Sequence, residues 1–161
     1  MSIVIGTDLS ERILTSDEAD SIFGLDGNDF IASRGGDDVI YGADGNDVIF
    51  SADGDDVLKG GAGNDILNGG HGDDQLFGGA GADTMTGGNG MDTFVFDFAD
   101  AGLVDEITDF TSGEDKILIQ GVGSNPTVEY NAHTGIVTVN GQAFIQLDPG
   151  LQIDGDDFFL A

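Results

Sequence analysis

Aspartate residues recur every nine residues through the first part of the chain. They are Asp29, Asp38, Asp47, Asp56, Asp65, Asp74, Asp83 and Asp92, and Asp20 extends the series towards the N-terminus. Carboxylate and carbonyl oxygens are the ligands that Ca²⁺ takes in proteins, about six to eight at a time. Mg²⁺ fits less well, because it gives up its water molecules reluctantly. The spacing therefore indicates binding of divalent cations, with Ca²⁺ as the expected ion.

A glycine precedes each of these aspartates and an apolar residue follows it. The glycines stand two residues before the Asp, at Gly27, Gly36, Gly45, Gly54, Gly63, Gly72, Gly81 and Gly90. The apolar residues stand two residues after it, at Ile31, Ile40, Ile49, Leu58, Leu67, Leu76, Met85 and Phe94. The complete unit is Gly-Gly-x-Gly-x-Asp-x-U-x, in which U is apolar, and it covers 60–68, 69–77 and 78–86. The region 24–95 is therefore a nine-residue repeat, which predicts a stacked architecture.

Each unit is expected to form one turn and one short strand. The Gly-Gly-x-Gly-x-Asp segment favours a turn, because Gly tolerates φ > 0 and lets neighbouring carbonyls point the same way. The x-U-x triplet favours a strand whose middle side chain faces inward. Such short strands are stable only when stacked, and turns alternating on two sides give one coil from two units, or 18 residues. The predicted fold class is all-β, a parallel β-roll with a C-terminal antiparallel β cap.

Stacking in this way aligns the aspartates in two columns. Column 1 contains Asp29, Asp47, Asp65 and Asp83, and column 2 contains Asp20, Asp38, Asp56, Asp74 and Asp92. Coils spaced like β-strands, roughly 4.8 Å apart, bring these charges into contact, so the stack needs counter-ions. Column 1 has three gaps and column 2 has three or four, because Glu18 replaces Gly in the turn before Asp20. We therefore expect six or seven Ca²⁺ ions in the roll.

The repeat unit is similar to the Ca²⁺-binding nonapeptide of RTX (repeats-in-toxin) proteins. The resemblance implies a parallel β-roll in which the sixth-position Asp of units i and i+2 and backbone carbonyls of the glycine-rich turn hold each ion. Besides the glycines above, those turns contain Gly42, Gly60, Gly69 and Gly78. The resemblance also implies export by a bacterial type I secretion apparatus and an extracellular location. Ordinary side chains at Arg34, Ala43 and Ala52 depart from the Gly-Gly pattern, which leaves the geometry of those turns open.

The chain divides into three parts. Residues 1–23 contain two degenerate copies of the unit, at 6–14 and 15–23, which suit the atypical end of a stack. Residues 24–95 form the Ca²⁺-binding β-roll. Residues 96–161, in which the nine-residue period stops, form the C-terminal β cap with an expected type I secretion signal.

The first segment of the cap carries a second resemblance. Residues 92–121 resemble the segment that follows the roll in serralysin-type proteases and alginate-epimerase R-modules. The resemblance implies a closing cap, in which Asp105, Asp109 and Asp115 either bind one more Ca²⁺ or form a solvated acidic edge.

The rest of the cap reads as strands. Residues 128–147 alternate apolar and polar side chains around Asn/Gly turns, which predicts an antiparallel meander. The ending 154–161 is acidic and then apolar. It resembles the uncleaved signal of type I substrates, and it also suits a last strand buried in the cap.

Charge and composition exclude several classes of function. The 161 residues carry 31 Asp and Glu against 4 Lys and Arg, a formal net charge of −27. Nucleic acids and anionic membranes require a basic surface, which four cations cannot supply. No apolar run approaches the roughly 20 residues of a membrane span, and the first residues lack the charged region of a signal peptide. Without Cys, the chain can form neither disulfides nor thiolate metal sites.

No catalytic motif accompanies the repeat. His71 and His133 are the two histidines, and neither lies in a His-Glu-x-x-His pattern. There is no Gly-x-Ser-x-Gly elbow and no phosphate-binding loop. Stacking explains the paired carboxylates better than acid–base chemistry does, so we expect no enzyme activity.

The outward strand positions are also apolar. Phe30, Val48, Phe50 and Ile66 share one face of the roll, and Phe23, Val39, Tyr41, Val57 and Phe77 share the other. Such stripes often contact a partner, so one face is expected to be covered by the C-terminal meander or by self-association with a second copy of the protein. The bland alternative is the ordinary preference of strands for such residues.

Together these patterns predict a secreted, non-catalytic RTX-type protein that folds as it binds several Ca²⁺ ions outside the cell. Two alternatives stay open. The chain could be the calcium-dependent folding and secretion module of a larger secreted enzyme, which the full-length reading frame would reveal. It could instead act in adhesion or surface assembly through its apolar faces, which would retain it at the cell surface rather than in the medium.

Overall fold

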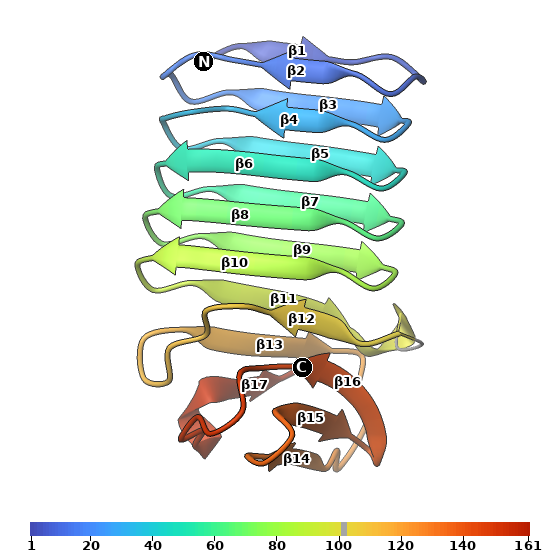
Figure 1. Ribbon diagram of the computed structural model, residues 1–161, viewed down its shortest axis with the longest axis vertical. Helices are drawn as coiled ribbons and strands as arrows, with labels where there is room; N and C mark the ends of the chain where they lie inside the picture. The colour runs from blue at the N-terminus through green and yellow to red at the C-terminus, as the bar shows by residue number, and fades with distance from the viewer. Residues whose placement is uncertain (101–102) are drawn as a thin grey trace.

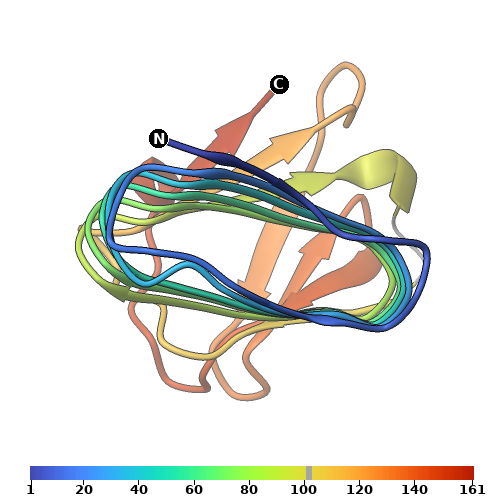
Figure 2. The same ribbon diagram turned by 90° about the horizontal axis from the view of Figure 1, so that it is seen from above.

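The computed structural model describes residues 1–100 and 103–161, and strands dominate its architecture. Figure 1 shows the strands stacked as successive coils along one axis, with the antiparallel strands at the C-terminal end. Viewed along that axis, the coils superimpose as a flattened ring (Figure 2). The prediction of a parallel β-roll followed by antiparallel C-terminal strands is confirmed.

Two sheets form the broad faces of the roll. The first is parallel throughout and has the order β1 (Ile3–Ile5), β3 (Ser21–Asp26), β5 (Val39–Asp44), β7 (Val57–Ala62), β9 (Gln75–Ala80), β11 (Thr93–Asp97), β13 (Lys116–Gln120) and β17 (Phe158–Leu160). From its other end, the second has the order β2 (Arg12–Leu14), β4 (Phe30–Ala32), β6 (Val48–Asp53), β8 (Ile66–His71), β10 (Thr84–Asn89), β12 (Asp105–Ile107), β16 (Gln142–Gln146), β15 (Ile136–Val139) and β14 (Val128–Asn131). Two short 3₁₀ helices, η1 (Phe98–Asp100) and η2 (Gly155–Asp157), complete the elements of the described residues.

The inward U positions form the core. Every U side chain from Ile22 to Phe94 has 0% exposed surface, and each lies in register with the U residue 18 positions away, as Leu58 does with Leu76. Ile107 and Ile117 continue the same two rows after the repeat has ended. The apolar core therefore extends beyond the region in which the sequence shows its period.

The central strands are longer than the three residues that the repeat suggests. In β7 the ladder pairs 57–59 with 75–77, passes over Gly60, and resumes at Gly61 and Ala62. The second glycine makes this continuation feasible, because Gly61 has φ 120° and its backbone can kink without leaving the ladder. The first half of the expected turn is therefore strand, and the reversal itself narrows to the Gly-x-Asp that follows.

Four ordinary residues adopt the same left-handed conformation at that second position. They are Leu25, Arg34, Ala43 and Ala52, with φ between 76° and 87°. Such a conformation costs a residue with a Cβ atom about 1–3 kcal/mol. The ladder continues through Leu25, Ala43 and Ala52, whereas β4 ends at Ala32 and an isolated bridge joins Gly35 to Asp53 beyond Arg34.

The C-terminal strands extend the roll. The predicted meander is confirmed as β14, β15 and β16, antiparallel to one another. One of our two expectations, that the meander covers a face of the roll, is wrong. Strand β16 pairs in parallel with β12, so the meander continues the second sheet. This pairing supplies hydrogen-bond partners to a sheet edge that would otherwise be open. Residues 101 and 102, inside the segment 92–121, lie outside the described residues.

Candidate metal centre

The structure brings the repeated aspartates together in the two predicted columns, one along each narrow edge of the roll. Column 1 follows the turns at the right of Figure 1, and column 2 follows those at the left. All nine side chains are at most 2% exposed. In each, Oδ1 accepts a hydrogen bond from a backbone N–H of the preceding coil, as Asp65 does from Asp47 at 2.8 Å and Asp83 from Asp65 at 2.8 Å. One carboxylate oxygen is thus satisfied by the fold itself.

The second carboxylate oxygen of each column aspartate is not satisfied by the fold. Oδ2 is buried and has no hydrogen-bond partner in Asp20, Asp29, Asp38, Asp47, Asp56, Asp65, Asp74, Asp83 and Asp92. Leaving a buried ionised oxygen without a partner is costly, and native proteins rarely do so. A row of such atoms at equivalent positions indicates that a positively charged partner belongs there.

Glycine at the first position of the turn creates the space beside each of these oxygens. A Cβ atom on Gly60 would collide with Oδ2 of Asp65 and would lie 2.7 Å from the carbonyl oxygen of Gly78, in the next coil. Equivalent spaces lie at Gly42 and Gly69, beside Asp47 and Asp74 respectively. The first-position glycines therefore keep open a space lined by a carboxylate oxygen and by a carbonyl oxygen of the following coil.

Carbonyls of the second and fourth turn positions also point towards the next coil. A Cβ atom on Gly61 would collide with the carbonyl oxygen of Ala43, and one on Gly63 with that of Gly45. The same relation links Gly72 to Gly54 and Gly81 to Gly63, among the fourth-position glycines that the repeat identified. Each gap between coils is consequently lined by oxygen atoms.

This donor set fits Ca²⁺. The atoms are carboxylate and carbonyl oxygens, the hard ligands that Ca²⁺ prefers, and neither nitrogen nor sulfur is required. Within the part of the chain that the structure describes, no three His, Cys, Asp or Glu side chains converge on one point. Backbone carbonyls would therefore have to complete each shell, as the sequence analysis expected of the glycine-rich turns.

Burial shifts the ionisation of the columns. It is the main cause that raises the pKa of Asp65 and of Asp74 to about 7, and neighbouring carboxylates add to the effect. The pKa of Asp92 rises to about 6 for the same reasons. Burial likewise raises the pKa of Asp29, Asp38, Asp47, Asp56 and Asp83. At Asp20, by contrast, the hydrogen bond from the N–H of Ser2 and the nearby N-terminus outweigh burial and lower the pKa.

Some of that repulsion comes from exposed acids outside the columns. After burial and the nearest column neighbours, Asp37 raises the pKa of Asp56, and Asp55 raises that of Asp74. Exposed acids therefore act on the buried carboxylates of column 2.

Both columns continue past the residues that the repeat identified. The N–H of Asp83 donates to Oδ1 of Asp105 at 2.9 Å, and that of Asp92 donates to Oδ1 of Asp115 at 3.0 Å. The sequence analysis ended the columns at Asp83 and Asp92, and this was wrong because the spacing lengthens from 18 to 22 and 23 residues. The signal that could have found them is the retained Asp-x-Ile at 105–107 and 115–117.

Of the three acids grouped as one candidate site in the cap, Asp109 and Asp115 lie near each other beside Asp92, and Asp105 lies apart from them. Asp105 continues column 1, whereas Asp115 continues column 2 on the opposite edge. Asp109 accepts hydrogen bonds from the backbone N–H groups of Gly87 and Gly88 at 3.0 and 2.8 Å. It therefore lies on the column 2 edge and fixes the backbone of the last repeat.

Two of the four basic side chains stack on aromatic rings and do not pair with the columns. Arg12 stacks over the Phe30 ring, and Lys59 lies between the rings of Tyr41 and Phe77, about 5 Å from each. The ion pairs among the described residues join the N-terminal amine to Glu18 and Lys116 to Asp157. None of the nine column aspartates is neutralised by a Lys or Arg side chain.

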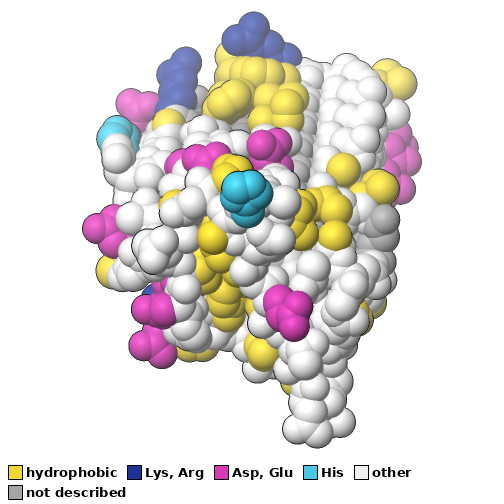
Figure 3. Space-filling model, turned by 60° about the horizontal axis from the view of Figure 1, so that its bottom comes forward, with side chains coloured by type: hydrophobic (Ala, Val, Ile, Leu, Met, Phe, Trp, Pro, Cys, Tyr) yellow, Lys and Arg dark blue, Asp and Glu magenta, His cyan; other side chains and the backbone are white. Residues whose placement is uncertain are grey.

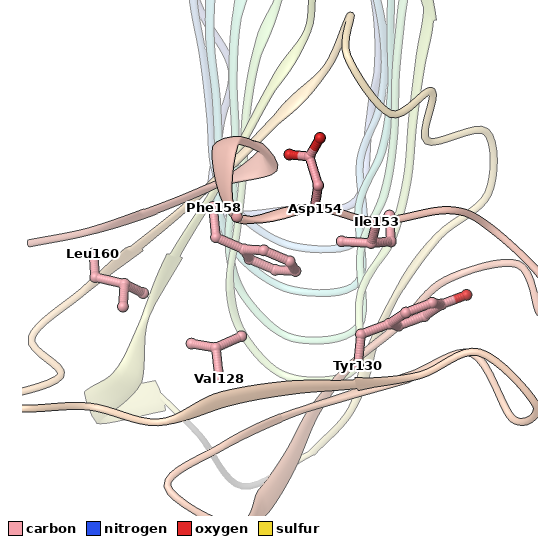
Figure 4. Close-up of a pocket in the computed structure, with 7 residues that line it drawn as sticks. Val128, Tyr130, Ile153, Asp154, Phe158 and Leu160 are labelled. Atoms are coloured by element: carbon pink, nitrogen blue, oxygen red, sulfur yellow. The ribbon is translucent and has the colours of Figure 1, made fainter.

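An apolar hollow lies at the C-terminal end. It has a volume of about 430 Å³ and is lined by Val128, Tyr130, Ile153, Asp154, Gly155, Phe158 and Leu160. Figure 4 shows the carboxylate of Asp154 pointing away from the apolar side chains. Among the lining residues, therefore, no carboxylate faces the apolar side chains.

Apolar side chains are exposed on the outside as well. Figure 3 shows them in patches over the face that it presents and over the C-terminal end. Phe50 and Ile66, which the sequence analysis placed on an outer face, are 38% and 46% exposed. The described residues include no helix that is long and apolar enough to cross a membrane.

Comparison with known proteins identifies the repeat. A family model for the RTX calcium-binding nonapeptide repeat matches four overlapping copies, at residues 5–40, 30–58, 50–85 and 59–94. A search of curated proteins gave no match. Among solved structures, the AlgE6R3 subunit of the Azotobacter vinelandii mannuronan C5-epimerase matches at 22% identity and a TM-score of 0.34, over 96% of this chain and 80% of that one.

Proposed function

Because the chain belongs to the RTX calcium-binding nonapeptide repeat family, we propose that it is a secreted, non-catalytic protein that folds when it binds calcium outside the cell. The observation that carries this proposal is the row of nine buried Oδ2 atoms without a hydrogen-bond partner. We propose six or seven ions in the gaps between Asp20 and Asp92, held by the column aspartates and by carbonyls of the glycine-rich turns.

Binding and folding are coupled through the shared aspartates. A bound Ca²⁺ ion supplies two positive charges between coils that otherwise repel each other. A central residue such as Asp65 faces a gap on each side, so filling one gap orders a carboxylate that the next gap also uses. Since the sites do not exist in the unfolded chain, the free energy of binding becomes free energy of folding.

This coupling suits a protein that leaves the cell unfolded. At the sub-micromolar calcium of a cytosol, the column carboxylates repel one another and keep the chain open for a type I secretion apparatus. Outside, at millimolar calcium, the same carboxylates close the roll. The formal net charge of −27 then describes the calcium-free chain, and six or seven ions would reduce it by +12 to +14.

Circular dichroism and calorimetry test this proposal together. In excess EGTA we expect a largely unfolded chain at pH 7.5. Added Ca²⁺ should restore the β-sheet spectrum with a steep titration and an uptake of six or seven ions per chain. A stable, fully β-structured protein in EGTA, or uptake of no more than one ion, would contradict the proposal.

The apolar outer faces support a further, separate proposal of self-association. Phe23 and Tyr41 stack at 5.0 Å on the face of β3 and β5, and Phe30 and Phe50 pack at 5.8 Å on the face of β4 and β6. Two such faces would bury aromatic surface between copies of the folded protein. Light scattering at millimolar Ca²⁺ should show a dimer or larger species that dissociates in the Phe50→Ser variant, and a monomer at every concentration would exclude it.

A further inference from the structure

A second ladder of side chains runs outside each buried column, at the fifth position of the turn. On the column 1 edge it consists of Asn28, Asn46 and Asn64, and on the column 2 edge it consists of Asp37, Asp55 and Asp73. All six are exposed. Amide and carboxylate therefore alternate strictly along the chain, and stacking sorts them to opposite edges of the roll.

Both outer ladders make the same backbone contact. The N–H of Asn64 donates to Oδ1 of Asn46 at 2.7 Å, and the N–H of Asp73 donates to Oδ1 of Asp55 at 2.9 Å. An amide oxygen performs this bridging as well as a carboxylate oxygen does. The negative charge of the column 2 ladder is consequently unnecessary for stacking. Repulsion between these carboxylates destabilises the calcium-free roll.

Other exposed charges concentrate the contrast in the middle of the roll. In the first coils, the third-position residues Asp26 and Asp44 lie on the column 1 edge, and the second-position Arg34 lies on the column 2 edge. The gap between Asp56 and Asp74 is flanked at the third and fifth positions by Asp53, His71, Asp55 and Asp73. The gap between Asp65 and Asp83 is flanked at the same positions by Ala62, Ala80, Asn64 and Ala82.

Charge at that distance acts on a divalent ion without touching it. A carboxylate roughly 8 Å from a doubly charged ion attracts it appreciably even through water, and two of them change an affinity by about tenfold at low ionic strength. The Debye length falls to about 3 Å at 1 M salt, which removes most of this attraction. Contacts within the buried gap are screened much less. The contribution of the outer carboxylates to calcium affinity can therefore be recognised by its loss at high salt.

We infer that the two edges of the roll are two classes of calcium site, and that the gap between Asp56 and Asp74 binds more tightly than the gap between Asp65 and Asp83. The inference rests on the proposed function. It assigns to Asp55 and Asp73 the role of attracting the ion from outside the gap, which the repeat unit itself does not require. The weaker of the two gaps thus lies between two repeats that match the consensus in full, 60–68 and 78–86, because their outer positions on the column 1 edge carry no charge.

Matched isosteric exchanges test this order. The variant Asp55→Asn with Asp73→Asn removes the outer charge from column 2, and Asn46→Asp with Asn64→Asp adds the same charge to column 1. Asn and Asp both keep the bridging Oδ1, so each ladder remains intact. In calorimetric titration with CaCl₂ at 10 mM KCl, the wild-type protein should show two classes of site, with the tighter class weakened about tenfold by the first exchange.

The second exchange should strengthen the weaker class by a similar factor, and both effects should fall below about twofold at 1 M KCl. The number of ions bound should stay that of the wild type. Superimposable titrations of the three proteins at low salt would overturn the inference while leaving the proposed function intact. A wild-type chain that takes up no calcium would instead overturn the proposed function itself.

Discussion

Buried carboxylates are treated in opposite ways by the roll and by the C-terminal base, which we define as residues 109–161. In the roll, each column aspartate keeps one buried oxygen without a partner. In the base, both oxygens of Asp157 are satisfied: Ser112 and the N–H of Asp154 donate to Oδ2 at 2.7 and 2.9 Å, and the N–H of Gly113 donates to Oδ1 at 3.0 Å.

In the base, the chain itself supplies every partner of its buried carboxylate Asp157, whereas in the roll it leaves one oxygen of each column aspartate without a partner. Lys116 lies 3.9 Å from Asp157, so the base contains its own counter-charge. Among the described residues, no column aspartate forms an ion pair with a basic group. We therefore expect the base to depend little on calcium and the roll to depend on it almost wholly.

The largest effect is expected from Asp65→Asn, which removes one charge from two neighbouring gaps. Calcium uptake should fall by about two ions, and the calcium concentration at the folding midpoint should rise by more than tenfold. Glu129→Gln, at an exposed position of β14 in the base, is the control and should leave both quantities unchanged. Equal behaviour of the two variants would show that the columns are not the sites.

Acid should affect the two regions in opposite directions. In EGTA, the raised pKa values of Asp65 and Asp74, about 7 each, mean that the folded roll binds more protons than the unfolded chain. Calcium-free stability should therefore rise as the pH falls from about 7 to about 4, the ordinary value for Asp. Circular dichroism of protein stripped of calcium at pH 8 and kept in calcium-free buffer should show β-structure at pH 4.5 and little at pH 8.

The contact at Asp157 should follow the reverse rule. Its hydrogen bonds and Lys116 outweigh burial and lower its pKa, so its contribution is present above pH 4 and is lost as the pH falls further. The protection of the Gly113 amide against hydrogen exchange, relative to the intrinsic exchange rate at each pH, should fall below that pH. A parallel gain of protection in both regions on acidification would contradict this comparison.

Asp157→Ala should weaken the base without touching calcium uptake. The hydroxyl and amide donors of Ser112, Gly113 and Asp154 are half-buried or exposed, so they would lose their acceptor and bond to water instead, at a cost of about 1 kcal/mol. Urea unfolding in saturating Ca²⁺ measures this cost, with the exposed neighbour Asp156→Ala as the control. A reduced number of bound ions would mean that the base is part of the calcium site.

The smallest effect is expected from Ala52→Gly in the roll backbone. Ala52 has φ 80°, and Ala52→Gly should relieve that strain and stabilise the calcium-bound protein by about 0.5 kcal/mol, net of the entropy that Gly loses on folding. Gly61→Ala should do the reverse and cost about 2 kcal/mol, because its Cβ would meet the carbonyl of Ala43. Thermal unfolding at fixed calcium compares the two variants.

Strict periodicity made the roll predictable from sequence. The nine-residue spacing fixes which side chain faces inward, and so the buried Leu58 and the alignment of Asp47 with Asp65 could be foreseen. The extension to Asp105 and Asp115 could not, because chain inserted after β11 shifts the spacing while parallel pairing with β10 and β11 preserves the register. Strand length was also missed, since Gly61 looks like a turn residue in sequence yet continues the ladder at positive φ.

The docking of the meander was hidden for a similar reason. Alternation predicts that 128–147 forms antiparallel strands, but nothing in that alternation says which edge receives them. The pairing of Asp105 with Ile145 settles this in three dimensions. Local pattern thus gave the elements of the base, and only long-range pairing gave their place.

The position of the cations has a consequence for how the chain senses its surroundings. Lys59 lies between two aromatic rings, and Arg12 lies over a third, so neither reaches a column. A Lys ammonium group placed in a gap would neutralise the column carboxylates permanently, and the roll would then fold with or without calcium. Because those gaps contain none of its own cations, folding of the chain is controlled by the calcium concentration of the solution around it.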